Sequence, residues 1–340
     1  MSSTIKDVAR LARVSISTVS RVQNGSANVR PETRERILQA FRQLDYEPNA
    51  VARSMIKKTT QSIGVIIPDI TNPFFPAVIK GIEDLARKLG FSTILCNTDE
   101  SVEDERKALQ ILRQKRVDGL IITAADEKGL HIKKAAGDGL PVVLVDRLVE
   151  EGNLDAVLID NVFGAYQAAR HLILQGHKKL GVIAGPQNLT PGRDRLQGFK
   201  KALREYGVQI EERYMKFGDF REESGYVLGR QLLEAPSRPT AIFACNNLMT
   251  IGLIRAILGS GLRIGVDIAV VGFDDIEIAT MLNPPITVVT RPMYKMGSLA
   301  FELLMERIEG NGPEEGRKVI LIPELVVRGS CRLAGSTVVA

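Results

Sequence analysis

Polar and charged side chains stand at the ends of several apolar segments in this 340-residue chain. Asp146 closes Val-Val-Leu-Val, Asn246 follows Ala-Ile-Phe-Ala-Cys, and Asp274 follows Val-Val-Gly-Phe. Arg195 lies at the opening of a predicted helix, in Thr-Pro-Gly-Arg-Asp-Arg. A carboxylate paired with an arginine can clamp the vicinal hydroxyls of a small ligand. The alternative interpretation is that strand-end Asp and Asn only cap turns.

Two phenylalanines can add apolar contacts to such a ligand site. Phe74 or Phe220 can stack on the apolar face of a sugar or on the plane of a base. The residue types together indicate noncovalent binding of a small molecule.

Motifs for phosphate binding and covalent catalysis are absent from the sequence. It contains no G-x-x-x-x-G-K-[ST] loop, no G-x-G-x-x-G at a strand end and no G-x-S-x-G elbow. Its only histidines, His131, His171 and His177, lack metal-ligand spacing and lie in Lys- or Gln-rich stretches, so we expect them on solvated surface. The sequence therefore predicts no enzyme, no cofactor and no bound metal.

The elements that must position the ligand-binding residues alternate from residue 62 onward. Apolar strand-like runs begin at Ile63, Ser92, Gly119 and Val142, and again at Leu180, Ala241, Ile268 and Ile286. Amphipathic patterns between them predict helices at 75–89, 102–114, 162–175, 191–206, 222–234 and 247–260. Near-continuous apolar strands separated by helices indicate doubly wound parallel α/β sheets, here two of them. Ligands bind such sheets beyond the carboxyl ends of the strands, so a cleft between two lobes can collect the strand-end residues.

Composition places the chain among globular proteins of the cytoplasm. Apolar residues make up 44% and charged residues 25%, and no apolar run approaches the length of a membrane span. The polar N-terminus lacks the layout of a secretory signal. The three cysteines, Cys96, Cys245 and Cys331, are odd in number and far apart, so we expect buried reduced thiols.

The positive charge is concentrated at the N-terminus. Residues 1–60 carry 11 Lys and Arg against five Asp and Glu, whereas the remaining 280 residues carry 34 against 35. A compact basic domain joined to a near-neutral one is typical of nucleic-acid binding, because neutralising phosphates releases counterions.

The first sixty residues have the spacing of a helix-turn-helix. Thr4 to Ala12 predicts a short amphipathic helix, Ser15 can cap a second one, and Pro31 starts a third. The breaker between the first two is so short that they must cross steeply, which lets the second fit the major groove. The third helix is expected to pack against the other two through Ile37, Leu38, Phe41 and Leu44.

At this point the motifs themselves are recognisable. Thr4-Ile-Lys-Asp-Val-Ala-Arg-Leu-Ala, Val14-Ser-Ile-Ser-Thr-Val-Ser-Arg-Val, Asn24-Gly and Tyr46-Glu-Pro-Asn-Ala-Val-Ala-Arg-Ser resemble the lactose-repressor (LacI) family of bacterial transcription regulators. The resemblance implies that base edges are read by Ile16, Ser17 and Arg21, with Thr18, Ser20 and Asn24 near phosphates. Arg21 can pair with guanine, Ser17 can donate or accept, and Ile16 can cover a thymine methyl, unless Ile16 packs in the core.

Residues 48–58 match the hinge helix of the family, which is ordered on operator DNA and enters the minor groove. Met55 stands where the family has an apolar wedge, usually leucine, and Ala52 permits close approach to the groove floor. Asn49 and Arg53 can reach acceptors or phosphates. The predicted DNA-contacting set is Thr4, Ile16, Ser17, Thr18, Ser20, Arg21, Asn24, Asn49, Ala52, Arg53 and Met55.

Two positions depart from the family pattern. Arg13 stands in the turn where glycine is common, and Arg30 stands where serine caps the third helix. A positive φ at Arg13 and a missing cap at Arg30 would each cost about 1 kcal/mol. Both arginines also add positive charge. We therefore expect them to lower the stability of the domain and to raise its affinity for DNA phosphates.

The resemblance also implies a two-lobed core of the type I periplasmic-binding-protein fold. The family's effector contacts fall, motif by motif, on Phe74, Asp146, Arg195, Phe220, Asn246, Asp274 and Arg291. Asn247 replaces an aspartate that the family often has at the cleft rim. The segments around Thr190 and Gly218 look most like sugar-responsive, ribose-type members.

These observations together predict a cytoplasmic, homodimeric repressor of a carbohydrate-utilisation operon, binding near-palindromic operator DNA under the control of a sugar effector. A purine-type corepressor-dependent regulator and a global catabolite regulator remain alternatives, and a transport sugar-binding protein is a remote one that needs a secretory signal. The predicted domains are a helix-turn-helix domain at 1–46, a hinge helix and linker at 47–61, and an effector-binding and dimerisation core at 62–340. The lobes of the core are predicted at about 62–160 with 292–322, and 161–291 with 323–330.

Overall fold

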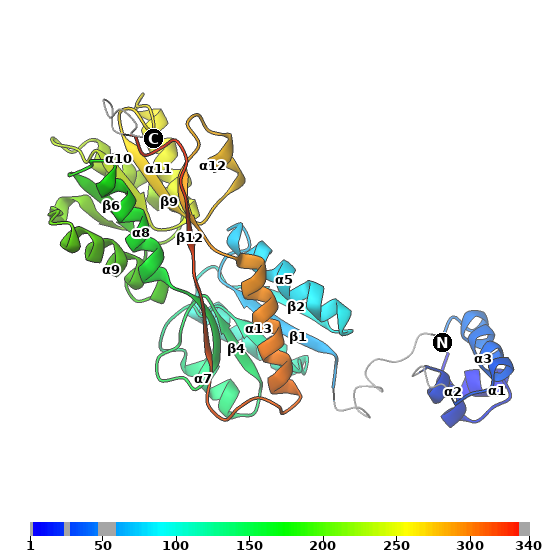
Figure 1. Ribbon diagram of the computed structural model, residues 1–340. Helices are drawn as coiled ribbons and strands as arrows, with labels where there is room; N and C mark the ends of the chain where they lie inside the picture. The colour runs from blue at the N-terminus through cyan, green and yellow to red at the C-terminus, as the bar shows by residue number, and fades with distance from the viewer. Residues whose placement is uncertain (1–2, 24–27, 47–58, 333–340) are drawn as a thin grey trace. The chain divides into compact units, whose positions relative to one another are not determined.

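The computed structural model describes residues 3–23, 28–46 and 59–332. The chain separates into two compact units, Met1–Gln61 and Ser62–Ala340 (Figure 1). The predicted hinge helix, residues 48–58, lies outside the described residues.

The first unit is a small three-helix domain. Its helices are α1 (Ile5–Leu11), α2 (Ile16–Gln23) and α3 (Pro31–Gln43). Val8, Val19 and Ile37 are fully buried where the three helices meet. Leu38 was expected in this core and is 39% exposed, whereas Ala40 is buried. The buried stripe of α3 follows helical spacing from Ile37, and a residue one step along is rotated off that stripe.

The local signals at the helix ends act as expected. Asp7 Oδ2 accepts hydrogen bonds from the Thr4 amide at 3.0 Å and from the Thr4 hydroxyl at 2.6 Å. Ser15 Oγ accepts from the Thr18 amide at 3.2 Å and so begins α2. Arg13 has a φ of +52°, in the left-handed region that favours glycine. Arg30 occupies the N-cap of α3 and makes no side-chain cap hydrogen bond. The predicted positive φ at Arg13 and the predicted missing cap at Arg30 are therefore both confirmed.

The second unit contains two doubly wound sheets. In the first lobe the strand order is β11-β5-β4-β3-β1-β2, and in the second it is β12-β10-β9-β8-β6-β7. The pairings within the sheets are parallel, except that β12 runs antiparallel to β10. The strand bounds are β1 Ser62–Ile67, β2 Ser92–Asn97, β3 Gly119–Ile122, β4 Val142–Val145, β5 Asp155–Ile159, β6 Leu180–Ala184, β7 Met215–Phe217, β8 Ala241–Ala244, β9 Ala269–Phe273, β10 Thr287–Thr290, β11 Lys318–Leu321 and β12 Glu324–Val326.

Helices cover both faces of each sheet. In the first lobe α5 and α13 pack on one face, and α6 and α7 on the other, because successive strand residues such as Ile66 and Ile67 point to opposite sides. In the second lobe α8 packs beside α9, and α10 beside α11 (Figure 1). The helix bounds are α5 Phe74–Lys88, α6 Val102–Gln114, α7 Leu130–Gly137, α8 Asn161–Leu174, α9 Thr190–Glu205, the 3-10 turn Glu212–Tyr214, α10 Glu222–Leu233, α11 Asn247–Gly259, α12 Glu277–Met281 and α13 Met293–Ile308.

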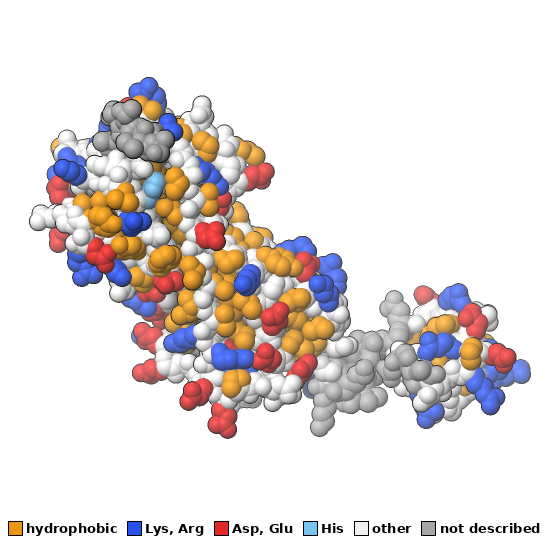
Figure 2. Space-filling model, viewed as in Figure 1, with side chains coloured by type: hydrophobic (Ala, Val, Ile, Leu, Met, Phe, Trp, Pro, Cys, Tyr) orange, Lys and Arg blue, Asp and Glu red, His pale blue; other side chains and the backbone are white. Residues whose placement is uncertain are grey.

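The chain passes between the lobes in three places. These are the connections from β5 to α8, from β10 to α13, and from β11 to β12 (Figure 1). Figure 2 shows hydrophobic side chains gathered on the face of the core that the β11–β12 return crosses. Ile320, Ile322 and Val327 on this return are more than half exposed.

The predicted architecture, two parallel α/β lobes after a three-helix domain, is confirmed. The longer predicted helices agree with the structure to within about a residue at each end. The short elements β5, β7, β11, β12 and α12 were not identified in advance. Within the described part of the chain, no helix is both long and apolar enough to cross a membrane.

The expectation for His177 is wrong, and the expectation of buried reduced thiols is confirmed except that Cys96 is only half-buried. His177 was expected on solvated surface but is 2% exposed; its ring nitrogens lie 3.0 Å from the Thr240 hydroxyl and 3.2 Å from the Cys331 carbonyl oxygen. Its two hydrogen bonds satisfy a buried polar ring, which the surrounding lysines in the sequence conceal. The cysteines are free thiols, buried at Cys245 and Cys331 and half-buried at Cys96. Burial raises the pKa of the Cys245 thiol to about 12.

Candidate functional site

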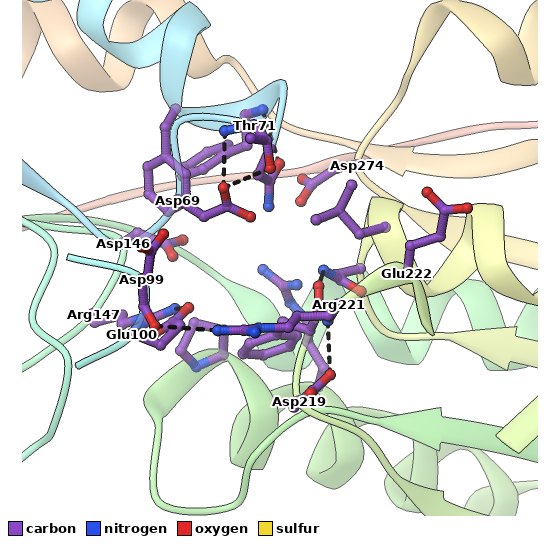
Figure 3. Close-up of a pocket in the computed structure, with 18 of the residues that line it drawn as sticks. Asp69, Thr71, Asp99, Glu100, Asp146, Arg147, Asp219, Arg221, Glu222 and Asp274 are labelled. Atoms are coloured by element: carbon purple, nitrogen blue, oxygen red, sulfur yellow. Dashed lines mark hydrogen bonds and ion pairs between the residues drawn. The ribbon is translucent and has the colours of Figure 1, made fainter. Parts of the chain in front are cut away.

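A cavity of about 450 Å³ lies where the carboxyl ends of strands from both lobes meet (Figure 3). Every residue predicted to contact an effector lines it, and these are Phe74, Asp146, Arg195, Phe220, Asn246, Asp274 and Arg291. The topology explains the convergence, because each of these residues follows a strand end or opens the next helix.

Arg291 holds the centre of the cavity wall together. Its Nε and Nη2 donate to the two carboxylate oxygens of Asp274, with the second bond at 2.7 Å, and its Nη1 donates to Asp146. The Arg291 side chain is 3% exposed and lies over the Phe74 ring, with Cζ 3.8 Å from the ring centroid. One planar guanidinium therefore bridges two carboxylates from different lobes.

Arg195 is fully buried in the second lobe. Its Nε donates to Asn161 Oδ1 at 2.8 Å, and its Nη1 donates to the Cys245 carbonyl oxygen at 2.6 Å. Its Cζ lies 3.7 Å from the centroid of the Phe273 ring. These contacts leave Nη2 as the donor without a described protein partner and therefore available to a ligand in the cavity.

The charges in this cluster shift one another's titration. Burial alone would raise the pKa of the Asp146 carboxyl, but the positive charges of Arg291, Arg195 and Arg147 hold it below its usual value. Burial, with the nearby charge of Arg291, lowers the pKa of the Arg195 guanidinium to about 10. At neutral pH these groups stay ionised, and the cavity presents fixed charges.

Asn246 has a structural role in addition to its place in the lining. Its Oδ1 caps α11 by accepting from the Met249 amide at 2.9 Å, and its Nδ2 donates to the Phe220 carbonyl oxygen at 2.7 Å. The turn-capping alternative thus describes Asn246 well, whereas the Asp146 and Asp274 carboxylates face arginine. Asp146, Phe220 and Asp274 have φ values of +69°, +69° and +70°. Such strained backbone is concentrated at functional sites.

Arg147 is a third buried arginine in the cavity, and it was not among the predicted effector contacts. Arg147 Nη1 and Nη2 donate to Glu100 at 2.6 and 2.7 Å, and Nη1 also donates to the Ala124 carbonyl oxygen. Its side chain is 4% exposed, and its Nε has no hydrogen-bond partner among the described residues. Its position directly after Asp146 at a strand end is the signal that would have identified it.

Loops from both lobes complete the rim of the cavity. Figure 3 shows Asp69, Asp274 and Arg221 around the open space. Asn247 Nδ2 donates to Asn72 Oδ1 at 2.8 Å. Asn247, which stands where the family often has aspartate, therefore makes a neutral contact between the lobes. The other lining residues that were not predicted are Asp69, Thr71, Phe75, Asp99, Glu100, Pro191, Asp219, Arg221, Glu222 and Leu248.

The first unit exposes part of the predicted DNA-contacting surface. Ile16 on α2 is 45% exposed, so it does not pack in the core. Ser17 and Thr18 hydroxyls each lie 2.8 Å from Ser15 Oγ, and Ser20 and Arg21 lie on the same helix. Thr4 begins α1 through its contacts with Asp7. Asn24, Asn49, Ala52, Arg53 and Met55 lie outside the described residues.

Comparisons with known proteins identify the family of the chain. The family model described as periplasmic binding proteins and sugar binding domain of LacI family matches residues 60–337, and that of bacterial regulatory proteins, lacI family, matches residues 4–49. The ribose operon repressor of Halalkalibacterium halodurans is 40% identical over 325 residues, covering 96% of both proteins. The HTH-type transcriptional repressor PurR of Photobacterium profundum is 38% identical over 330 residues, covering 97% of this chain and 98% of that protein.

Two solved structures have a similar fold. A lac repressor dimer bound to operator and the anti-inducer ONPF matches with a TM-score of 0.87 and 30% identity, covering 98% of this chain and 100% of that one. A LacI family transcriptional regulator from Enterococcus faecium with bound ribose matches with a TM-score of 0.70 and 32% identity, covering 80% of this chain and 98% of that one.

The fold and the cavity define a helix-turn-helix protein with a two-lobed, small-molecule-binding core of the periplasmic-binding-protein type. The chain belongs to the LacI family of bacterial transcription regulators. It is a DNA-binding transcriptional repressor with an effector-binding domain, and not an enzyme. In the part of the chain that the structure describes, no group of three or more His, Cys, Asp and Glu is placed to hold a metal ion.

Proposed function

We propose that this repressor controls a carbohydrate-utilisation operon and that its effector is a neutral, ribose-like sugar bound in the cavity between the lobes. The observation that carries the proposal is the charge of the lining, which contains seven carboxylates and four guanidinium groups. Carboxylates accept strong hydrogen bonds from hydroxyl groups, and guanidinium groups donate to ring and hydroxyl oxygens. An excess of carboxylates disfavours a phosphorylated ligand.

The aromatic side chains favour a sugar over a purine base. A purine needs an open ring face to stack on. Phe74 is 1% exposed and has the Arg291 guanidinium over its ring, and Phe273 has Arg195 over its ring. Phe220 is 9% exposed and has the Arg147 guanidinium over its ring, with Cζ 6.0 Å from the centroid, so it too lacks a fully open face for a base. The near-equal identity to a ribose operon repressor and to PurR keeps the purine effector as the second candidate.

Isothermal titration calorimetry of the full-length protein tests the effector. The panel is D-ribose, D-glucose, ribose 5-phosphate, hypoxanthine and guanine. We expect D-ribose to bind and ribose 5-phosphate to bind at least tenfold more weakly. The variant Asp274→Asn should abolish ribose binding, because it removes a charged acceptor from the lining. The matched control is Asp267→Asn, whose carboxylate pairs with Arg263 outside the cavity. Saturable binding of hypoxanthine without ribose binding would replace the sugar by a purine corepressor.

We further propose that α2 reads a near-palindromic operator as part of a homodimer. Ile16, Ser17 and Arg21 would contact base edges, with Thr18 and Ser20 at phosphates. The exposed Ile16 side chain and the lac repressor dimer bound to operator support this proposal. One helix reads only a few base pairs, and a two-fold pair doubles the specific contacts.

Selection of bound duplexes from a random pool, followed by sedimentation of the complex, tests the DNA proposal. We expect a two-fold symmetric consensus and a mass of two chains per duplex. An asymmetric consensus bound by a single chain would contradict the dimer. Titration of the effector into the complex then shows whether it releases or tightens DNA, and linkage requires DNA to change effector affinity by the same factor.

A further inference from the structure

The first turn of α9 lacks a capping group of its own. Its N-cap residue is Leu189, which has no side-chain acceptor, and the turn that follows reads Thr190-Pro-Gly-Arg193 without an acidic residue. The free amide groups at a helix N-terminus carry partial positive charge and favour a nearby carboxylate. By contrast, α11 is capped by its own Asn246.

A carboxylate from the other lobe lies at this turn. Glu127 follows β3 in the first lobe and is only 8% exposed. Its Oε1 accepts from the Thr190 hydroxyl at 2.9 Å, and its Oε2 accepts from Arg193 Nη1 at 2.6 Å. Both contacts cross between lobes. The loop that supplies Glu127 is itself held, because the Glu150 amide donates to the Glu127 carbonyl oxygen at 2.7 Å.

The same turn is joined to the cavity at both sides. Thr190 Oγ1 accepts from the Leu148 amide at 3.2 Å, and Leu148 directly follows the buried cavity residue Arg147. Two residues beyond Arg193 in the same helix, Arg195 projects into the cavity. Glu127, Thr190 and Arg193 do not belong to the lining, so they act on a ligand only through their neighbours.

Like the Arg291–Asp146 pair across the cavity, the Glu127–Arg193 contact between the lobes is an ion pair, whereas two other contacts between the lobes are not. The Asn247–Asn72 contact pairs neutral amides, and Arg221 Nη2 donates to a backbone oxygen, that of Asp99, at 3.2 Å. The Glu127 carboxylate is nine-tenths buried and meets both a cation and a hydroxyl. Charge-assisted hydrogen bonds of this kind are roughly twice as strong as neutral ones.

We propose that Glu127 is a positioning residue for effector binding. It anchors the first turn of α9 to the first lobe, and thereby fixes Arg195 in the cavity and couples the placement of Arg195 to the separation of the lobes. The effector part of this inference rests on the proposed sugar effector; the anchoring part does not.

Calorimetry with D-ribose and thermal unfolding test the effector part. The variants are Glu127→Gln, Arg193→Gln and the charge exchange Glu127→Arg with Arg193→Glu. The matched control is Glu103→Gln, whose 66% exposed side chain pairs with Lys107 within α6. We expect each single variant to weaken ribose binding about tenfold. The charge exchange should recover most of this loss, and Glu103→Gln should leave the affinity unchanged.

Hydrogen exchange without ligand tests the anchoring part. In Glu127→Gln, amides of residues 189–199 should exchange faster, whereas those at the start of α11 should not change because Asn246 still caps that helix. Unchanged exchange in residues 189–199 would overturn the anchoring. Faster exchange with unchanged ribose affinity would overturn the positioning role. If ribose does not bind the unmodified protein, the proposed sugar effector fails, and the exchange result alone decides on the anchoring.

Discussion

Arg291 donates a hydrogen bond to Asp146, a residue 145 positions earlier in the chain, and so joins the two lobes across the cavity. The guanidinium follows β10, where the chain leaves the second lobe, and the carboxylate ends β4 in the first. Because the other two donors bind Asp274, both carboxylates depend on one buried cation. Removing Arg291 would take away the hydrogen-bonded counter-ion of both carboxylates, and Arg195 and Arg147 would remain near Asp146 only as neighbouring charges.

Replacing Arg291 by glutamine should destabilise the core strongly. The change leaves Asp146 and Asp274 buried without their counter-ion, and breaking a buried pair from one side costs about 3–5 kcal/mol. Urea unfolding of the full-length protein at pH 7, followed by circular dichroism, measures this loss.

Arg291→Lys is the informative companion. Lysine keeps the positive charge but lacks the planar guanidinium that reaches both carboxylates. The stability of the Arg291→Lys variant should therefore lie between those of the unmodified protein and the glutamine variant. A loss below about 1 kcal/mol in Arg291→Gln would mean that water or protonation compensates the two carboxylates, and that the cluster does not hold the lobes.

Acid should remove the contribution of another buried carboxylate, Asp155. Burial raises the pKa of this carboxyl, but hydrogen bonds from Arg307 and Arg317 outweigh burial and hold it well below the usual value. A carboxyl whose folded pKa is lowered stabilises the protein above the unfolded pKa of about 3.9, and this stability is lost as pH falls further.

The variant Asp155→Asn isolates this effect. It should be about 2 kcal/mol less stable than the unmodified protein above about pH 5, because the partly exposed arginines can still reach water. The difference should shrink as pH falls below about 4. Urea unfolding at pH 7, 5 and 3.5 measures it, and a difference independent of pH would show that the ion pairs contribute through packing alone.

The cavity could be located from the sequence because its residues follow strand ends. Asp146 and Asp274 stand directly after buried apolar runs, and parallel topology brings such positions to one edge. Glu127 lies within a polar loop, and its contact with Arg193 depends on how two lobes with separate sheets meet. Neither periodicity nor spacing contains that information. His177 was misjudged for the same reason, because Thr240 and Cys331 come from distant segments.

Substitutions at two residues of α2 should affect DNA affinity and domain stability separately. Ile16 is 45% exposed, whereas Val19 is fully buried one turn along. Ile16→Ala should lower affinity for the selected operator about tenfold and change the unfolding free energy by less than about 0.5 kcal/mol. Val19→Ala should destabilise the domain by about 2 kcal/mol. Fluorescence anisotropy and thermal unfolding measure the two quantities, and unchanged operator affinity in Ile16→Ala would remove that residue from the contact surface.

Arg13 should trade stability for DNA affinity. Its φ of +52° is strained for arginine and open to glycine, so Arg13→Gly should raise the unfolding free energy of the domain by up to about 1 kcal/mol. The same change removes a positive charge from the turn before α2. If Arg13 neutralises a phosphate, the slope of log affinity against log salt should fall by about one, on specific and nonspecific DNA alike. Anisotropy titrations at several salt concentrations measure the slope. A more stable variant with an unchanged salt slope would confirm the backbone strain at Arg13 but contradict the phosphate contact, because a charge that lies away from the duplex releases no counterion.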